Sequence, residues 1–228
     1  MPQMSPQNAP DMPATARPSL AYNLAGIVVL VLLLAIGMAY AIEALGKTRE
    51  HALADSGTGE RISQTISGRE LSIPASWFRH GEQMRDGFTS QIDLRVAYAP
   101  DGAASALPVD ITLLPRSRVR TSASLLDRVY LHQFTEDVLG GVPGLVGKPL
   151  RPEEGYAGES VWYDALSANP FVAKCSAPVA EGQAAQCLRM VHLPGGIAAI
   201  YAFDATILQS WRRFDAEMER WLAPIGAW

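Results

Sequence analysis

The hydrophobic pattern of the chain begins with one long apolar stretch. No charged residue occurs in Pro18–Ile42, and its inner part, Leu24–Met38, consists almost entirely of Leu, Ile, Val, Ala and Gly. As a helix, this stretch is long enough to cross the roughly 30 Å of hydrocarbon in a bilayer. Tyr22 and Tyr40 stand near its two ends, where aromatic rings prefer the membrane interface. We therefore predict a transmembrane helix over residues 20–42.

Two alternatives stay open for this segment. Ala39-Tyr40-Ala41 matches the small-x-small form of a signal-peptidase site, which would make the stretch a cleaved secretion signal. The anchor is favoured because the apolar core is at the upper end of signal lengths. Lys47, Arg49 and Arg61 follow the span, and the positive-inside rule alone would keep the domain in the cytoplasm. We predict a periplasmic domain instead, because long domains are translocated despite their charges and because of the cysteines discussed below.

The rest of the chain divides by composition. Residues 1–19 are rich in proline and polar side chains, which is typical of a disordered tail. Residues 43–61 are predicted to form a neck that starts as a helix and ends flexibly around Gly57-Thr58-Gly59. Residues 62–228 have the composition of one globular domain, long enough to bury a core.

Alternation of apolar and polar residues predicts strands in this domain. The clearest strand covers residues 88–98, where one parity holds Phe88, Ile92, Leu94, Val96 and Tyr98 as a buried face. A short strand ends at Pro74, and another, around Val109–Leu113, follows an Asp101-Gly102 turn and ends at Pro115. Further strands are expected over residues 145–150, 156–165, 171–175, 188–193 and 197–203, with Pro194-Gly195-Gly196 as the last tight turn.

Two helices are predicted from apolar residues at helical spacing. Ser124 and Asp127 fit a capping box at the start of a helix over residues 125–139, which Gly140-Gly141 ends. Asp204 is the expected cap of a final helix with the apolar stripe Ile207, Trp211, Phe214, Met218, Leu222 and Ile225. Strands in hairpins with two separated helices predict an α+β domain, built on one antiparallel sheet packed by helices.

The order of these elements resembles the PsbP-like fold of photosystem extrinsic proteins. An early strand ending at a proline, a meander, a helix in mid-domain and a last hairpin before a C-terminal helix are shared, over Ile62–Ile225. The chain also resembles single-span membrane-anchored proteins of proteobacteria. The resemblance lies in the pattern of elements, so it implies a fold and no activity.

Charge and motifs limit the classes of function. The formal net charge is −4 from 19 Lys and Arg and 23 Asp and Glu, mixed along the chain, so a basic face for nucleic acid is not expected. Around Gly140–Lys148, Val142 and Pro149 stand where a phosphate loop requires Gly and Ser or Thr. The four histidines lack partners at metal-ligand spacing, and no Gly-x-Ser-x-Gly occurs. We expect no cofactor, no metal and no catalytic residue.

One neighbourhood combines aromatic and charged side chains. Tyr156, Glu159 and Trp162 fall within one expected strand, where parity puts Glu159 in an otherwise apolar row. Arg189 repeats this arrangement in a later strand. A buried Glu159–Arg189 pair beside aromatic rings would be a ligand-binding site. The alternative is a solvent-facing side of the sheet, or a purely structural pair.

Cys175 and Cys187 flank a segment of loop composition between two expected strands. If these strands pair, the cysteines lie across the mouth of a hairpin at the Cα separation of about 5.5 Å that a disulfide needs. We predict this disulfide, which indicates an oxidising compartment. The alternatives are free thiols in a cytosolic domain, or a metal site, for which two further ligands are missing.

The combined prediction is a non-catalytic binding or assembly module of unspecified ligand. It would be anchored in the inner membrane, with its domain in the periplasm and an envelope protein as partner. The alternative is a periplasmic enzyme with a site near Glu159. A concave pocket at Glu159 and Arg189 would favour the enzyme, and a flat surface the module.

Overall fold

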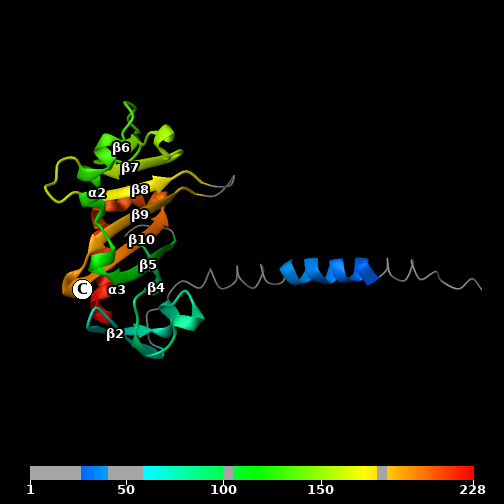
Figure 1. Cartoon of the computed structure of the whole chain (residues 1–228). Coiled ribbons are helices and arrows are strands. Elements are labelled where there is room, and N and C mark those ends of the chain that lie inside the picture. The colour runs from blue at the N-terminus through cyan, green and yellow to red at the C-terminus, as the bar shows by residue number, and fades with distance from the viewer. Residues whose placement is uncertain (1–26, 41–58, 100–104, 179–183) are drawn as a thin grey trace, which may run out of the picture. The chain divides into compact units, whose positions relative to one another are not determined.

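The chain divides into two compact units, Met1–His51 and Ala52–Trp228. The computed structural model describes residues 27–40, 59–99, 105–178 and 184–228. In the first unit, residues 27–40 form a helix (Figure 1). All of these residues are exposed. Within the described ranges, no helix is long and apolar enough to cross a membrane. The predicted tail, the ends of the predicted span and nearly all of the predicted neck lie outside the described residues, so they stay predictions.

A hairpin opens the second unit. β1 (Arg61–Ile66) and β2 (Arg69–Pro74) pair antiparallel through a two-residue turn in which Ser67 and Gly68 have φ of 53° and 78°. Positive φ at both turn positions matches the twist of the flanking strands. The short strand β3 (Gly87–Phe88) adds to β1 in parallel and completes a three-stranded sheet.

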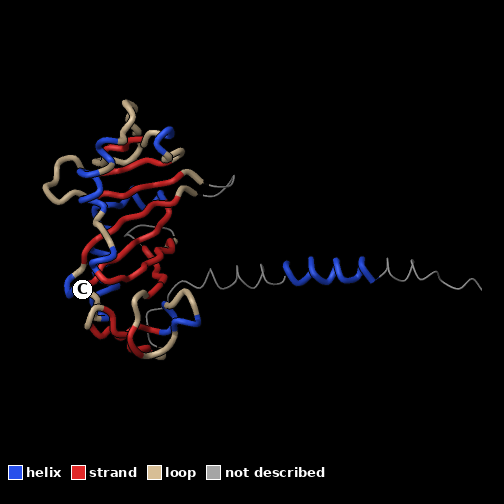
Figure 2. Tube along the Cα trace, in the orientation of Figure 1, coloured by secondary structure: helices blue, strands red, loops and turns tan. Residues whose placement is uncertain are grey.

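A seven-stranded antiparallel sheet forms the centre of this unit, in the spatial order β4-β5-β10-β9-β8-β7-β6 (Figures 1 and 2). Its strands are β4 (Ile92–Tyr98), β5 (Leu107–Pro115), β6 (Val146–Pro149), β7 (Glu159–Tyr163), β8 (Val172–Ser176), β9 (Gln186–His192) and β10 (Ile197–Asp204). β10 joins the two halves, because it pairs with β5 on one side and β9 on the other. The predicted α+β fold with an antiparallel sheet packed by helices is confirmed.

The last helix, α3 (Trp211–Leu222), packs on one face of this sheet. It follows a 3-10 helix at Ala205–Ser210, where Asp204 Oδ1 accepts a hydrogen bond from Thr206 N (2.8 Å). Phe214 is fully buried, with ring centroids 4.7 to 6.1 Å from those of Tyr98, Tyr201, Phe203 and Phe171. The predicted apolar stripe is confirmed apart from Trp211, which is only half-buried.

The shorter helix α2 (Ser122–Arg128) lies on the opposite face. Ser122 Oγ accepts a hydrogen bond from Met190 N of β9 (2.8 Å). A second cluster forms there from Leu126, Tyr130, Leu150, Val161 and Val172. Since alternate residues of a strand point to opposite faces, Val172 and Cys175 of β8 lie on opposite sides, which separates this cluster from the core under α3.

The predicted helix over residues 125–139 is wrong at both ends. Its N-cap is Thr121, whose Oγ accepts a hydrogen bond from Ser124 N (3.2 Å), and α2 ends at Arg128. After a 3-10 turn at Tyr130–His132, Thr135 N donates to Pro149 O (3.0 Å) and Leu139 N to Gly147 O (2.8 Å). The apolar spacing therefore reflects a loop that runs along the edge of the sheet, where pairing with β6 outweighs helix propensity.

The prediction that Phe88 lies on the buried face of a strand is also wrong. Its side chain is 92% exposed, whereas Ile92, Leu94, Val96 and Tyr98 are fully buried. The predicted continuous strand breaks between β3 and β4, where the Thr89 hydroxyl donates to Gln91 O (2.8 Å) and accepts from Gln91 N (3.3 Å). Such local bonds favour a turn, so the alternation of buried and exposed residues in β4 does not extend back to Phe88. The predicted Asp101-Gly102 turn lies outside the described residues.

Both outer strands of the large sheet are partly covered by irregular segments. Phe78 forms a β-bridge to Leu94, and Arg79 N donates to Asp93 O (3.0 Å) beside β4. The segment that contains Phe134 and Leu139 covers β6 in the same way. This cover limits the addition of a further strand, because fewer backbone groups are available.

Candidate functional site

The four predicted site residues do not form one site. Glu159 and Arg189 belong to β7 and β9, which are separated by β8, and their side chains have different partners. The predicted Glu159–Arg189 pair is therefore wrong. Periodicity identified both charges as unusual, but the partner of each depended on the strand order and on α3.

Glu159 is held by the neighbouring strand. Its Oε1 accepts a hydrogen bond from Lys174 Nζ (2.8 Å), and the other carboxylate oxygen is buried without a hydrogen-bond partner. Lys174 Nζ also lies 6.0 Å from the centroid of the Tyr156 ring, so Tyr156 and Glu159 share one cation. Burial, and then the charge of Glu159, raise the pKa of the nearby Tyr130 hydroxyl to about 12. Glu159 and Lys174 therefore form an ion pair beside the second cluster, which contains Tyr130.

Arg189 is buried under α3. Its Nε and Nη2 donate to the two carboxylate oxygens of Asp215 (2.9 and 2.6 Å), and Nη1 donates to Val172 O (3.3 Å). The guanidinium carbon lies 4.3 Å from the centroid of the Phe171 ring. Arg189 and Asp215 also line a small pocket of about 370 Å³ that includes His192. Each guanidinium nitrogen thus has a partner, which fits a structural role.

The predicted disulfide between Cys175 and Cys187 is confirmed. The two residues are directly opposite each other in β8 and β9, with Cα atoms 4.0 Å apart. Cys175 borders a larger pocket of about 640 Å³, which Trp162, Leu208 and the predicted site residue Glu159 also line. A Cβ at Gly147 would lie 2.7 Å from the Trp162 ring, so only glycine allows the ring this position.

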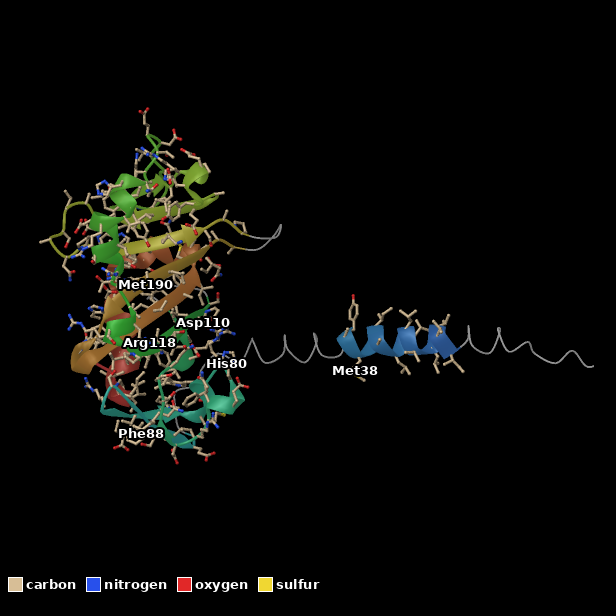
Figure 3. The ribbon with its side chains drawn as sticks, in the orientation of Figure 1. Met38, His80, Phe88, Asp110, Arg118 and Met190 are labelled. Atoms are coloured by element: carbon tan, nitrogen blue, oxygen red, sulfur yellow. A yellow bond between two sulfur atoms is a disulfide. The ribbon has the colours of Figure 1, made fainter. Side chains whose placement is uncertain are left out.

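A further surface was not predicted from the sequence. On the face opposite α3, the register aligns Ile200 with Met190 and Ala202 with Leu188. None of these four side chains is buried, and Leu188 is 38% exposed. α2 packs against the β8 and β9 part of this face. We call these four residues, together with the charged side chains that border them, the open face. The bordering side chains are Arg79, Asp93, Arg95, Asp110 and Lys174. Met190 and Asp110 of this face are labelled in Figure 3.

Charged groups border the apolar centre of the open face. Next to Ala202 in the register comes Asp110, then Arg95, which donates from Nε to Asp110 Oδ1 (2.6 Å). Arg79 approaches the same carboxylate at 3.3 Å. On the other side, Leu188 is opposite Lys174. The apolar centre therefore has a charged border on both sides.

Asp93 completes this border as an internally satisfied carboxylate. Burial alone would raise its pKa, but hydrogen bonds from Thr112, Gln83 and Gln91 outweigh burial and lower the pKa of the Asp93 carboxyl.

The sequence does carry a signal for the open face. The β10 segment Ile197–Phe203 has apolar residues at both parities, which is typical of a strand with contacts on both faces.

Comparisons with known proteins give one structural likeness. No protein-family model matches the chain, and no curated protein sequence matches it. A solved structure with a similar arrangement is that of Smlt3025, an immunity protein of the Stenotrophomonas maltophilia type IV secretion system. It is 12% identical, covers 72% of this chain and 92% of its own, and has a TM-score of 0.48. A likeness of this degree does not extend to function.

Proposed function

We propose that the chain is a membrane-anchored, non-catalytic binding or assembly module of the cell envelope, with its domain on the periplasmic side of the inner membrane. The observation that carries the binding role is the open face. A sheet face left to water is expected to alternate to polar residues, yet Ile200, Ala202, Leu188 and Met190 occupy its centre. An apolar centre within a polar border is the arrangement of protein interfaces.

The membrane anchor is supported by the helix at residues 27–40. All of its described side chains are apolar or small apart from Tyr40, and all are exposed. A helix that is apolar on every side is stable when hydrocarbon or protein surrounds it. We keep the predicted span over residues 20–42 as part of this proposal.

The periplasmic location is supported by the disulfide. Bridges of this kind persist in oxidising compartments and are rare in the cytosol.

We also keep the PsbP-like resemblance as a proposal about the fold. The alternative of an enzyme near Glu159 stays a second candidate, because Glu159 and Trp162 both line the pocket of about 640 Å³, although Lys174 holds one oxygen of the Glu159 carboxylate.

The test is affinity purification of the tagged, full-length chain from detergent-solubilised membranes of its host. We expect a second protein to elute in a constant ratio to the chain at several protein loads. A chain that elutes alone, as a single species, would contradict the binding role.

A further inference from the structure

We propose that the pocket of about 640 Å³ beside β7 binds a small, uncharged and largely apolar molecule that carries a hydroxyl or amide group. This inference rests on the proposed binding function and names a ligand class for it. The pocket has the volume of a small-molecule site, and such sites combine apolar walls with a few polar groups.

The floor of the pocket is the large sheet. Two alternate residues of β7, Ser160 and Trp162, form it together with Pro149 of β6 and Cys175 of β8. The register places Pro149 and Cys175 on either side of Ser160. Trp162 packs against the core cluster that contains Cys175, as expected for residues on one face of a sheet. Backbone pairing of three strands and the disulfide hold this floor in place, so the site is preformed.

The walls of the pocket are apolar. Leu139 and Val142 come from the segment that runs along β6, and Leu208 comes from the 3-10 helix before α3. The half-buried Trp162 ring lies over Gly147, where a Cβ would be 2.7 Å from the ring. An aromatic ring with three aliphatic side chains favours a ligand with an apolar body, because binding then removes apolar surface of both partners from water.

The charges of the lining do not favour an ionic ligand. Among the described residues that line the pocket there is no Lys, Arg or His to pair with an anion. The two carboxylates give a cation no buried partner, because Glu159 is already paired with Lys174 (2.8 Å) and Asp137 is exposed to water. An unpaired charge moved from water into an apolar site is costly, so an uncharged ligand fits this lining.

Hydroxyl groups of the lining indicate the polar end of the ligand. Ser160, on the floor, makes no side-chain hydrogen bond within the described part of the chain. Thr135 Oγ1 is buried and also lacks a hydrogen-bond partner. Polar groups inside native proteins nearly always have a partner, and a molecule in the pocket can supply one. A hydroxyl both donates and accepts, so a neutral hydroxyl or amide on the ligand complements it.

Fluorine NMR of the full-length chain in detergent, labelled with fluorotryptophan, tests this inference. The chain has five tryptophans, and the resonance that disappears in Trp162→Phe is assigned to Trp162. Three probes share one ring and differ in their head group: benzyl alcohol, benzylammonium and benzoate. We expect benzyl alcohol to shift the Trp162 resonance saturably, with an affinity about tenfold higher than that of either ion. The resonance of Trp77, which lies outside the pocket, should stay unchanged.

Two substitutions at one position separate the space in the pocket from its hydroxyl. Ser160→Phe puts a ring into the pocket and should abolish the shift. Ser160→Ala should weaken the binding of benzyl alcohol by about fivefold, which is the effect of one hydrogen bond. Ser90→Ala, at an exposed serine outside the pocket, should change nothing. An unchanged Trp77 resonance and oxidised cysteines show that each variant has folded.

Each other outcome overturns the inference. Tighter binding of benzylammonium or benzoate would make the ligand an ion, and unchanged affinity in Ser160→Ala would remove the hydroxyl from the site. Binding that persists in Ser160→Phe would place the probe outside the pocket. If no probe gives a saturable shift, the pocket is not a ligand site. A protein that still purifies with the chain would then leave the proposed function standing, whereas a chain that also purifies alone would reject both.

Discussion

Arg189 of β9 and Asp215 of α3 form a two-point ion pair beneath the helix, with distances of 2.9 and 2.6 Å. Arg189 is 7% exposed, whereas the Asp215 side chain is about half exposed. Asp215→Ala should lower the free energy of unfolding by about 1 to 3 kcal/mol, since a largely buried guanidinium loses two charge-assisted bonds while water still reaches it from the Asp215 side. Urea unfolding measures the change.

The matched control for this pair is Glu219→Ala, on the exposed side of the same helix. It should change stability by less than about 0.5 kcal/mol. Equal effects of the two variants would show that the ion pair contributes nothing beyond the helix itself.

Phe214 should contribute more to stability than Trp211. Phe214 is fully buried among four aromatic rings, and Phe214→Ala should cost about 3 to 5 kcal/mol. Trp211 is half-buried, and its Nε1 donates to Pro143 O (3.0 Å), so Trp211→Ala should cost clearly less. Midpoints of urea unfolding with unchanged m-values give the ranking. The reverse order would mean that α3 is anchored through the Pro143 loop.

The buried tyrosines should make the domain sensitive to alkali. Burial raises the pKa of Tyr130 from 10.0 to about 12, and it also raises the pKa of Tyr98 and Tyr201. Above about pH 10 the unfolded chain loses these protons first, so stability is complete below pH 10 and falls as the pH rises toward 12. The slope should reach about 1.4 kcal/mol per pH unit for each such tyrosine. Tyr130→Phe should give a shallower slope in unfolding measured from about pH 9 to about pH 11, and an identical slope would refute the assignment.

The disulfide should be present in the protein from its native compartment. Non-reducing peptide mass mapping is expected to find the Cys175 and Cys187 peptides joined. Replacing both cysteines with serine should cost about 3 kcal/mol in the chain-entropy model, since the two positions are 12 residues apart. Two thiols that alkylate without prior reduction would contradict the bridge and weaken the periplasmic assignment.

Topology can be read with reporters fused after Trp228. Alkaline phosphatase folds only in an oxidising compartment, so the fusion should be active if the domain is periplasmic. A carbonate wash should leave the full-length chain in the membrane pellet. An inactive phosphatase together with a fluorescent cytoplasmic reporter would reverse the orientation, and release of a product starting near Ile42 would show a cleaved signal.

Local patterns predicted the strands and the last helix well, because their causes are local. The burial of alternate residues in β4 and the helix cap at Asp204 each depend on residues that are close together in the sequence. The helix predicted over residues 125–139 failed because pairing with β6, which follows later in the chain, decides that segment. The predicted partner of Arg189 was wrong for a related reason: the partner depends on which strands are neighbours, and a single chain's periodicity does not encode strand order. The open face was not predicted for the same reason, although β10 carries apolar residues at both parities.

The central position of β10 has a consequence for how fast the sheet assembles. β4 and β5 form one meander and β6 to β9 another, and these halves become a single sheet only when Ile197–Asp204 inserts between them. Its register pairs Ile197 with Pro115, across more than a third of the chain. Closing so long a loop before native contacts compensate for it slows folding, as in other proteins of high contact order. Until β10 arrives, two incomplete sheets with unpaired backbone persist, and this is the interval in which the newly made domain is most exposed to aggregation and most in need of a chaperone.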